Sequence, residues 1–188
     1  MGLGRRVTIR PSSTVQARVR AVNAANGWDA PTGATERAAI VARLALAISE
    51  VAEAIEVVRT PPADDAHLAE EMADVVIRLL DLGSGLGIEV LDAGPPGSGV
   101  PGGFDASSVD GLVAALGVVA STIGRLLDAF AVSPSTAPSR DQIARGLAAP
   151  CVLVEGLAAA VGLDLGAAID AKIARNVARG LRHGGRAI

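Results

Sequence analysis

Residues 46–81 read LAISEVAEAIEVVRTPPADDAHLAEEMADVVIRLLD, and this stretch decides how the rest of the chain is organised. Apolar residues recur in it at helical spacing on both sides of a Thr-Pro-Pro-Ala-Asp turn at residues 60–64. The pattern predicts two helices that fold back on each other as an antiparallel hairpin. Because an isolated helical hairpin cannot bury its apolar stripe, we expect further helices to pack on this one.

Each predicted helix of the hairpin carries two carboxylates three residues apart, Glu50 with Glu53 and Glu71 with Asp74. Residues at this spacing share one face of a helix, with Cβ atoms about 5–6 Å apart. Folding back makes the two pairs face each other beside the apolar seam, where unpaired charge is costly. Oxygen ligands suit a hard divalent cation, so we predict that these four side chains bind Mg²⁺, with Mn²⁺ as an alternative. The competing interpretation is an ordinary solvated acidic face.

Two segments resemble the MazG-like all-α nucleoside triphosphate pyrophosphohydrolases. The first is the hairpin motif, E-x-x-E and E-x-x-D, separated by the 17 residues 54–70. The second is similar to the basic tail of the family and contains Lys172, Asn176, Arg179 and His183, followed by two glycines. The resemblance implies an all-α helical bundle that uses Mg²⁺ to hydrolyse nucleoside triphosphates to the monophosphate and pyrophosphate.

The resemblance also implies roles for single residues. It assigns metal binding to the four carboxylates of the hairpin and the role of catalytic base to Glu50 or Glu53. Trp28 would lie by the nucleobase, although packing as a rigid plug is the competing interpretation. Three residues near the C-terminus would contact the phosphates, unless they belong to an ordinary solvated helix: Lys172, Asn176 and Arg179. Three more residues lie at positions that match the family, where they would form salt bridges or support the metal ligands: Glu56, Arg59 and Asp81.

Composition favours helices and argues against several classes of protein. Half of the 188 residues are hydrophobic and three are aromatic, so the core must consist of Ala, Val, Leu and Ile. The net charge of −3 does not indicate a nucleic-acid partner. The lone Cys151 excludes an intrachain disulfide and favours a reducing compartment. Because the longest uncharged stretch, residues 111–124, is shorter than a membrane span and no signal peptide is evident, we expect a cytoplasmic protein without a membrane partner.

Charge is distributed unevenly along the chain. Residues 50–92 contain eleven acidic and two basic residues, whereas five basic residues and no acidic side chain follow Asp170. An acidic centre suits a metal ion and a basic tail suits a polyphosphate. The charge pattern therefore agrees with a nucleotide substrate.

A Gly/Pro linker at residues 94–104 divides the chain into a predicted catalytic half, residues 1–93, and a second half, residues 105–188. The sequence of the second half is similar to that of the first at offsets of 72 and 75 residues, although two alanine-rich hairpins can also resemble each other by chance. We interpret it as a degenerate copy that packs on the first half as an intrachain pseudo-dimer, with a homodimer as the alternative assembly. Under these offsets the four ligand positions align with residues that do not bind metals: Thr122, Arg125, Gly146 and Ala149.

Periodicity and capping residues predict the helices of both halves. We expect helices over residues 14–25, 36–59, 65–82, 108–130 and 165–179. Side chains expected to cap helix N-termini are those of Thr35, Asp64 and Asp164. In the second half, Pro150 is expected to break its helix, since proline lacks the backbone donor.

Two further functions stay open at this point. The protein could be a non-catalytic helical module, derived from the same fold, that serves oligomerisation or partner binding. It could also hydrolyse a related phosphoribosyl nucleotide, which requires the same chemistry.

Overall fold

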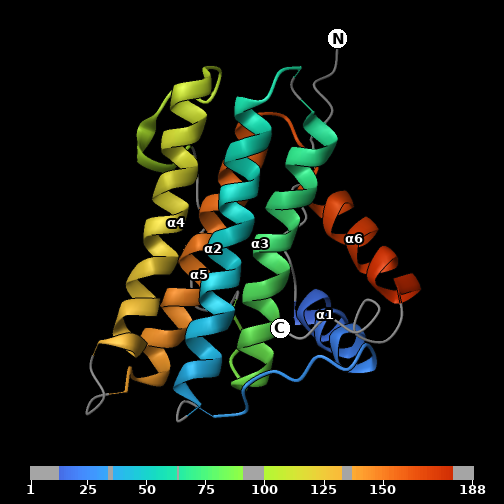
Figure 1. Ribbon diagram of the computed structural model, residues 1–188, viewed down its shortest axis with the longest axis vertical. Helices are drawn as coiled ribbons and strands as arrows, with labels where there is room; N and C mark the ends of the chain where they lie inside the picture. The colour runs from blue at the N-terminus through green and yellow to red at the C-terminus, as the bar shows by residue number, and fades with distance from the viewer. Residues whose placement is uncertain (1–12, 34–35, 63, 91–99, 133–136, 180–188) are drawn as a thin grey trace.

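The computed structural model describes residues 13–33, 36–62, 64–90, 100–132 and 137–179 and contains no strand in these ranges (Figure 1). The predicted all-α fold class is therefore confirmed. A short 3₁₀ turn, η2, covers the described end of the predicted linker. The helices, in chain order, are α1 (Ser13–Ala25), α2 (Arg37–Arg59), α3 (Asp65–Gly85), α4 (Val109–Ala131), α5 (Arg140–Ala160) and α6 (Leu165–Arg179), with η2 (Pro101–Gly103) before α4.

Four long helices form the core of the molecule. The hairpin α2–α3 packs on the hairpin α4–α5, with α2 against both α3 and α4, and α3 against α5 (Figure 1). Helices α1 and α6 lie together on the outer side of α3. One buried apolar cluster runs through all six helices, and its largest fully buried side chains include Phe130, Ile40, Leu44, Met72 and Leu79. The apolar stripe of the first hairpin is thus covered within one chain.

Side-chain caps fix where several helices begin. The Asp64 carboxylate accepts a hydrogen bond from the His67 amide at 2.9 Å, and the Asp164 carboxylate accepts one from the Ala167 amide at 2.9 Å. Both caps agree with the sequence-based prediction. Thr35 lies outside the described residues, and α2 begins at Arg37 after Glu36, which makes no side-chain cap hydrogen bond.

The expectation that Pro150 breaks its helix is wrong. Helix α5 runs without interruption from Arg140 to Ala160, with Pro150 buried inside it. A proline in a helix interior costs about 3 kcal/mol. Burial of Leu147, Val154 and Leu157 on either side offsets that cost, because each buried aliphatic side chain contributes about 1.5–3 kcal/mol.

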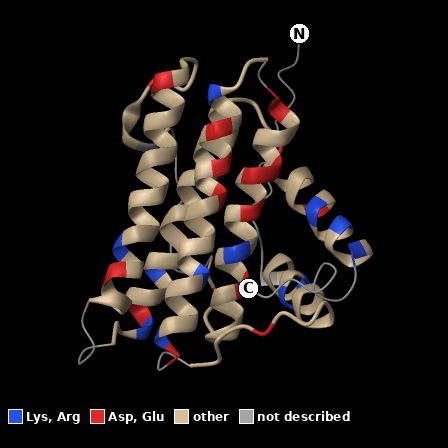
Figure 2. Ribbon diagram, in the orientation of Figure 1, with Lys and Arg blue, Asp and Glu red and all other residues tan. Residues whose placement is uncertain are grey.

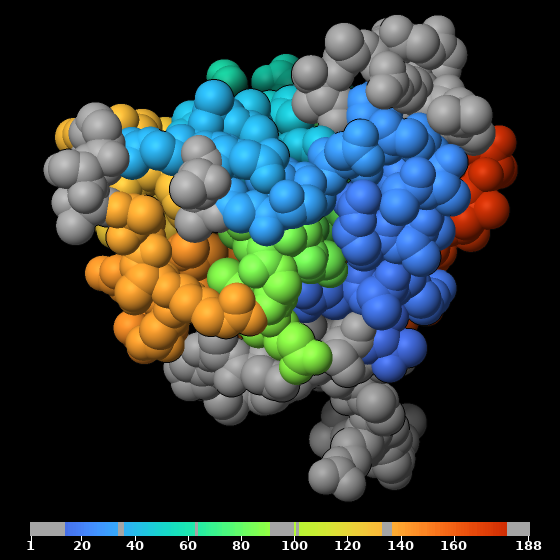
Figure 3. Space-filling view, turned by 90° about the horizontal axis from the view of Figure 1, so that it is seen from below, coloured from blue at the N-terminus to red at the C-terminus, as the bar shows by residue number. Residues whose placement is uncertain are grey.

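Seen from below, α1, the start of α2, the end of α3 and the start of α5 form one continuous end face (Figure 3). The Arg140 guanidinium donates to the carbonyl of Gly87, two residues after α3, and so connects the start of α5 with the chain that follows α3. Asp81 of α3 accepts a hydrogen bond from Arg20 of α1 at 2.9 Å and lies 3.9 Å from Arg43 of α2. The carboxylate is buried, so one acidic group connects three helices.

We expect Asp81→Ala to lower the free energy of unfolding by about 3 kcal/mol, because it leaves Arg20 and Arg43 without their carboxylate partner. Asp170→Ala is the matched control, since it removes the exposed pair between Arg18 and Asp170 and should cost less than about 1 kcal/mol. Urea denaturation measures both values. Equal losses in the two variants would contradict a role of Asp81 in connecting the helices.

Two described helices, α4 and α5, are long and apolar enough to cross a membrane by length and composition. The core helices of soluble proteins pass the same test, and both of these helices belong to the packed core. The expected absence of a membrane partner stays a prediction.

Candidate metal site

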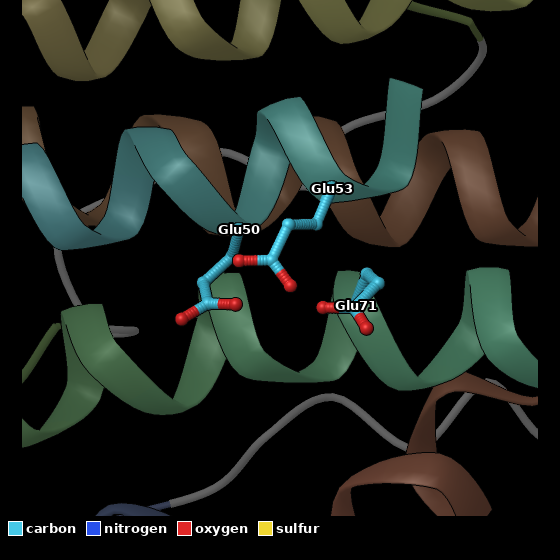
Figure 4. Close-up of side chains that lie close together, drawn as sticks. All are labelled: Glu50, Glu53 and Glu71. Atoms are coloured by element: carbon cyan, nitrogen blue, oxygen red, sulfur yellow. The ribbon is translucent and has the colours of Figure 1, made fainter. Parts of the chain in front are cut away.

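The structure brings together three of the four predicted metal ligands. Glu50 and Glu53 project from α2 and Glu71 from the adjacent, antiparallel α3 (Figure 4). One carboxylate oxygen from each lies within 4.8 Å of the other two. Glu50 and Glu71 are buried, whereas Glu53 is exposed at the edge of the cluster. Antiparallel packing of α2 on α3 produces this convergence, because each helix places its acids on the face turned toward the other.

Asp74, the fourth predicted ligand, contacts helix α6 instead. Its Oδ2 lies 2.5 Å from Nζ of Lys172, and the same ammonium lies 2.8 Å from Oε1 of Glu70. Arg175, one turn further along α6, pairs with the other oxygen of Glu70 at 2.8 Å. In Figure 2 the basic residues of α6 accordingly lie beside the acidic stretch of α3.

Two side chains of α3 contact the glutamates, the guanidinium of Arg78 and the imidazole of His67. Arg78 lies 2.5 Å from Glu50 Oε1, and His67 Nε2 lies 2.9 Å from Glu71 Oε1. Neither residue is among the ligands predicted from the sequence. The spacing of these residues could have indicated that they belong to the site, because positions 67, 71, 74 and 78 share one face of α3.

Burial and mutual repulsion govern the electrostatics of the cluster. The pKa of Glu71 is raised, first by burial and then by the neighbouring carboxylates of Asp74, Glu53 and Glu50. The pKa of Asp74 is also raised by burial, although its hydrogen bond with Lys172 opposes this effect. Burial lowers the pKa of Lys172, but its hydrogen bonds to Asp74 and Glu70 outweigh burial and raise it overall. A cation bound among the three glutamates would therefore stabilise their ionised form. Three carboxylate ligands suit Mg²⁺ or Mn²⁺.

The residues predicted to contact phosphates differ in their surroundings, and the contact given below for Asn176 is made by its backbone carbonyl. Lys172 is buried in the ion pairs with α3. The Asn176 carbonyl accepts a hydrogen bond from the Asn26 side chain at 2.7 Å, which connects α6 with α1. Arg179 is exposed at the end of α6. His183 lies outside the described residues.

Trp28 lies at the other end of α3 from the glutamates. It is half-buried, and its carbonyl accepts a hydrogen bond from Arg20, the residue that also binds Asp81. Asp81 is ten residues beyond Glu71, or about 15 Å along the helix. Both interpretations of Trp28, packing and contact with a nucleobase, stay predictions.

The remaining predicted supporting residues differ in their surroundings. Glu56 and Arg59 form an exposed ion pair of 3.9 Å on α2, a contact that is worth little in water. Asp81 forms the buried salt bridges described above. Of the three, Asp81 therefore has the clearest structural role.

No family model matches the chain, and no curated protein or solved structure matches it. The resemblance to the MazG-like enzymes rests on the two motifs, and membership of that family stays a prediction.

Proposed function

We propose that the protein is a Mg²⁺-dependent nucleoside triphosphate pyrophosphohydrolase of the MazG-like type, which releases a monophosphate and pyrophosphate. The observation that carries this proposal is the convergence of Glu50, Glu53 and Glu71 from two antiparallel helices. The pKa of Glu71 is raised, first by burial and then by the neighbouring carboxylates, so negative charge at this helix–helix seam is unfavourable. A divalent cation bound among the three carboxylates would compensate that charge.

The three glutamates would hold the metal, and Asp74 would join them if Lys172 releases it. A bound divalent cation neutralises the phosphate chain and makes water more acidic. Among the described residues Glu53 forms no ion pair, whereas Glu50 is held by Arg78. Glu53 is therefore our choice for the base that accepts the proton of the attacking water.

We further propose that the bundle consists of two pseudo-repeat halves, as in a tandem form of that fold. Helices α2 and α4 both have 23 residues and are offset by 72 at each end, and α3 and α5 both have 21 residues and are offset by 75. Their C-terminal hydrogen bonds repeat as well. The Ile88 amide bonds to the Gly83 carbonyl at 2.8 Å, and the Leu163 amide bonds to the Ala158 carbonyl at 2.8 Å. The second half would then be the intrachain partner that related proteins would obtain by forming a homodimer.

A non-catalytic oligomerisation or partner-binding module is the competing proposal. The existing partners of Glu50, Glu71 and Asp74, which are Arg78, His67 and Lys172, favour it, because a purely structural cluster needs such partners. Metal-dependent stabilisation distinguishes the two, since an ion that binds the folded state must raise its melting temperature.

The proposal is tested by incubating the protein with standard and damaged nucleoside triphosphates, and with a phosphoribosyl nucleotide, in Mg²⁺, Mn²⁺ or EDTA. We expect pyrophosphate release from at least one nucleotide in Mg²⁺ and none in EDTA. Thermal melting in the same buffers should show a higher Tm with the metal. Absence of both turnover and a metal-dependent shift would favour the structural module.

A further inference from the structure

The second hairpin contains a pocket of about 530 Å³ near the connection between α4 and α5, the lower end of these helices in Figure 1. Its polar lining consists of Thr122 and Arg125 from α4 and Gln142 and Arg145 from α5. Leu126, Ala129 and other small or apolar residues form the rest of the wall. The volume lies within the range of small-molecule sites, which is about 300–1,000 Å³.

The pocket occupies the positions that correspond to the glutamate cluster of the first hairpin. At an offset of 72, Glu50 and Glu53 align with Thr122 and Arg125. At an offset of 75, Glu70, Glu71 and Asp74 align with three residues that also line the pocket: Arg145, Gly146 and Ala149. Two acids, Glu53 and Glu70, are thus replaced by arginines, and Glu71 and Asp74 are replaced by a glycine and an alanine.

This replacement changes both the shape and the charge of the site. Gly146 lies so close to Leu126 that a Cβ there would be 3.0 Å from its methyl groups, so the backbone of α5 closely approaches α4 at this level. The hollow opens beside that contact, around Ala149 and Ala129. Among the described lining residues there is no Asp or Glu, although Arg145 pairs with the nearby Asp141 at 2.5 Å.

The lining of the pocket contains hydrogen-bond donors that suit an anion with several oxygens. Arg125 is oriented by a hydrogen bond of 3.0 Å to the Thr122 hydroxyl, and it approaches from the helix opposite Arg145. Gln142 uses its amide oxygen in the helix cap, which leaves its NH₂ group as a donor. Donors from three side chains match the three terminal oxygens of a phosphate monoester better than the two of a carboxylate. The apolar wall suits a ring attached to that phosphate.

We propose that the α4–α5 pocket binds an organic monophosphate of nucleotide size, without metal, at a site separate from the glutamate cluster. If the proposed function holds, this ligand class includes its product, and the second hairpin would serve as a nucleotide-sensing site. The binding itself does not depend on catalysis.

The test is isothermal titration calorimetry in EDTA with adenosine monophosphate, inorganic phosphate and adenosine as probes. We expect the monophosphate to bind more tightly than phosphate and adenosine not to bind. The double variant Arg125→Gln/Arg145→Gln should weaken binding by about a hundredfold, or about tenfold for each arginine. Ala149→Leu should also weaken it by filling the apolar side of the pocket.

Arg59→Gln is the matched control, because Arg59 is as exposed as Arg145 and likewise forms a pair within its own helix. Arg59→Gln should leave the binding of adenosine monophosphate unchanged. Glu53→Gln should also leave it unchanged, and this second variant tests whether the ligand binds at the glutamate cluster. The proposal is overturned if the monophosphate does not bind, if phosphate binds equally well, or if the double arginine variant binds like the wild type. Binding that is lost in Glu53→Gln would instead assign the ligand to the first hairpin.

Discussion

Glu53→Gln is expected to reduce Mg²⁺-dependent pyrophosphate release by about a hundred- to ten-thousandfold, the contribution of a positioned general base. The change removes one negative charge from the cluster with Glu50 and Glu71, so it should also weaken metal binding. Glu53 is exposed and forms no ion pair among the described residues, so folding should be unaffected. Initial rates of pyrophosphate release and the shift of Tm with Mg²⁺ measure the two effects.

Glu56→Gln provides the control for this variant. Glu56 lies three residues further along α2, is exposed like Glu53, and has polar contacts with Arg59 and Thr60 of its own segment. It should retain wild-type turnover and the wild-type metal-dependent shift. If Glu53→Gln also retained both, the glutamate cluster could not be the catalytic metal site.

Lys172→Met is expected to lower the free energy of unfolding by about 3 kcal/mol, because it leaves Asp74 and Glu70 at the α3–α6 seam without their shared cation. For a chain of this size that loss corresponds to a decrease in Tm of about 10 °C. Methionine keeps most of the apolar volume of the lysine side chain, so loss of packing contributes little. Thermal melting in EDTA measures the effect.

The same variant tests whether Lys172 and a metal compete for Asp74. Since the ammonium lies 2.5 Å from the Asp74 carboxylate, its removal frees a fourth carboxylate for the cation. We therefore expect Mg²⁺ to raise the Tm of Lys172→Met more than that of the wild type, and we expect this extra gain to disappear when Asp74→Asn is added.

Arg179→Gln is the control on the same helix, and its exposed side chain predicts a change within about 0.5 kcal/mol. A Lys172→Met protein that melts like the wild type, with an altered KM alone, would contradict the ion-pair role. That result would favour the phosphate contact that the resemblance implies.

Local sequence signals determined much of the architecture. The apolar periodicity of residues 46–81 predicted the first hairpin, and Asp64 and Asp164 marked helix starts that the structure confirms. These signals succeed because caps and helix faces depend on residues three or four positions apart. The convergence of Glu50, Glu53 and Glu71 was predictable for the same reason, once the turn at residues 60–64 made the hairpin antiparallel.

Contacts between distant helices could not be predicted in this way. The local pattern placed Asp74 with the other carboxylates, yet Lys172, 98 residues away in sequence, pairs with it. Local rules also predicted a break at Pro150, where burial in the four-helix core keeps α5 helical through the proline. Sequence alone thus determined the helices and which acids share a face. Tertiary packing decided which cation meets each acid and where a pocket opens, because both depend on how helices far apart in the chain approach each other.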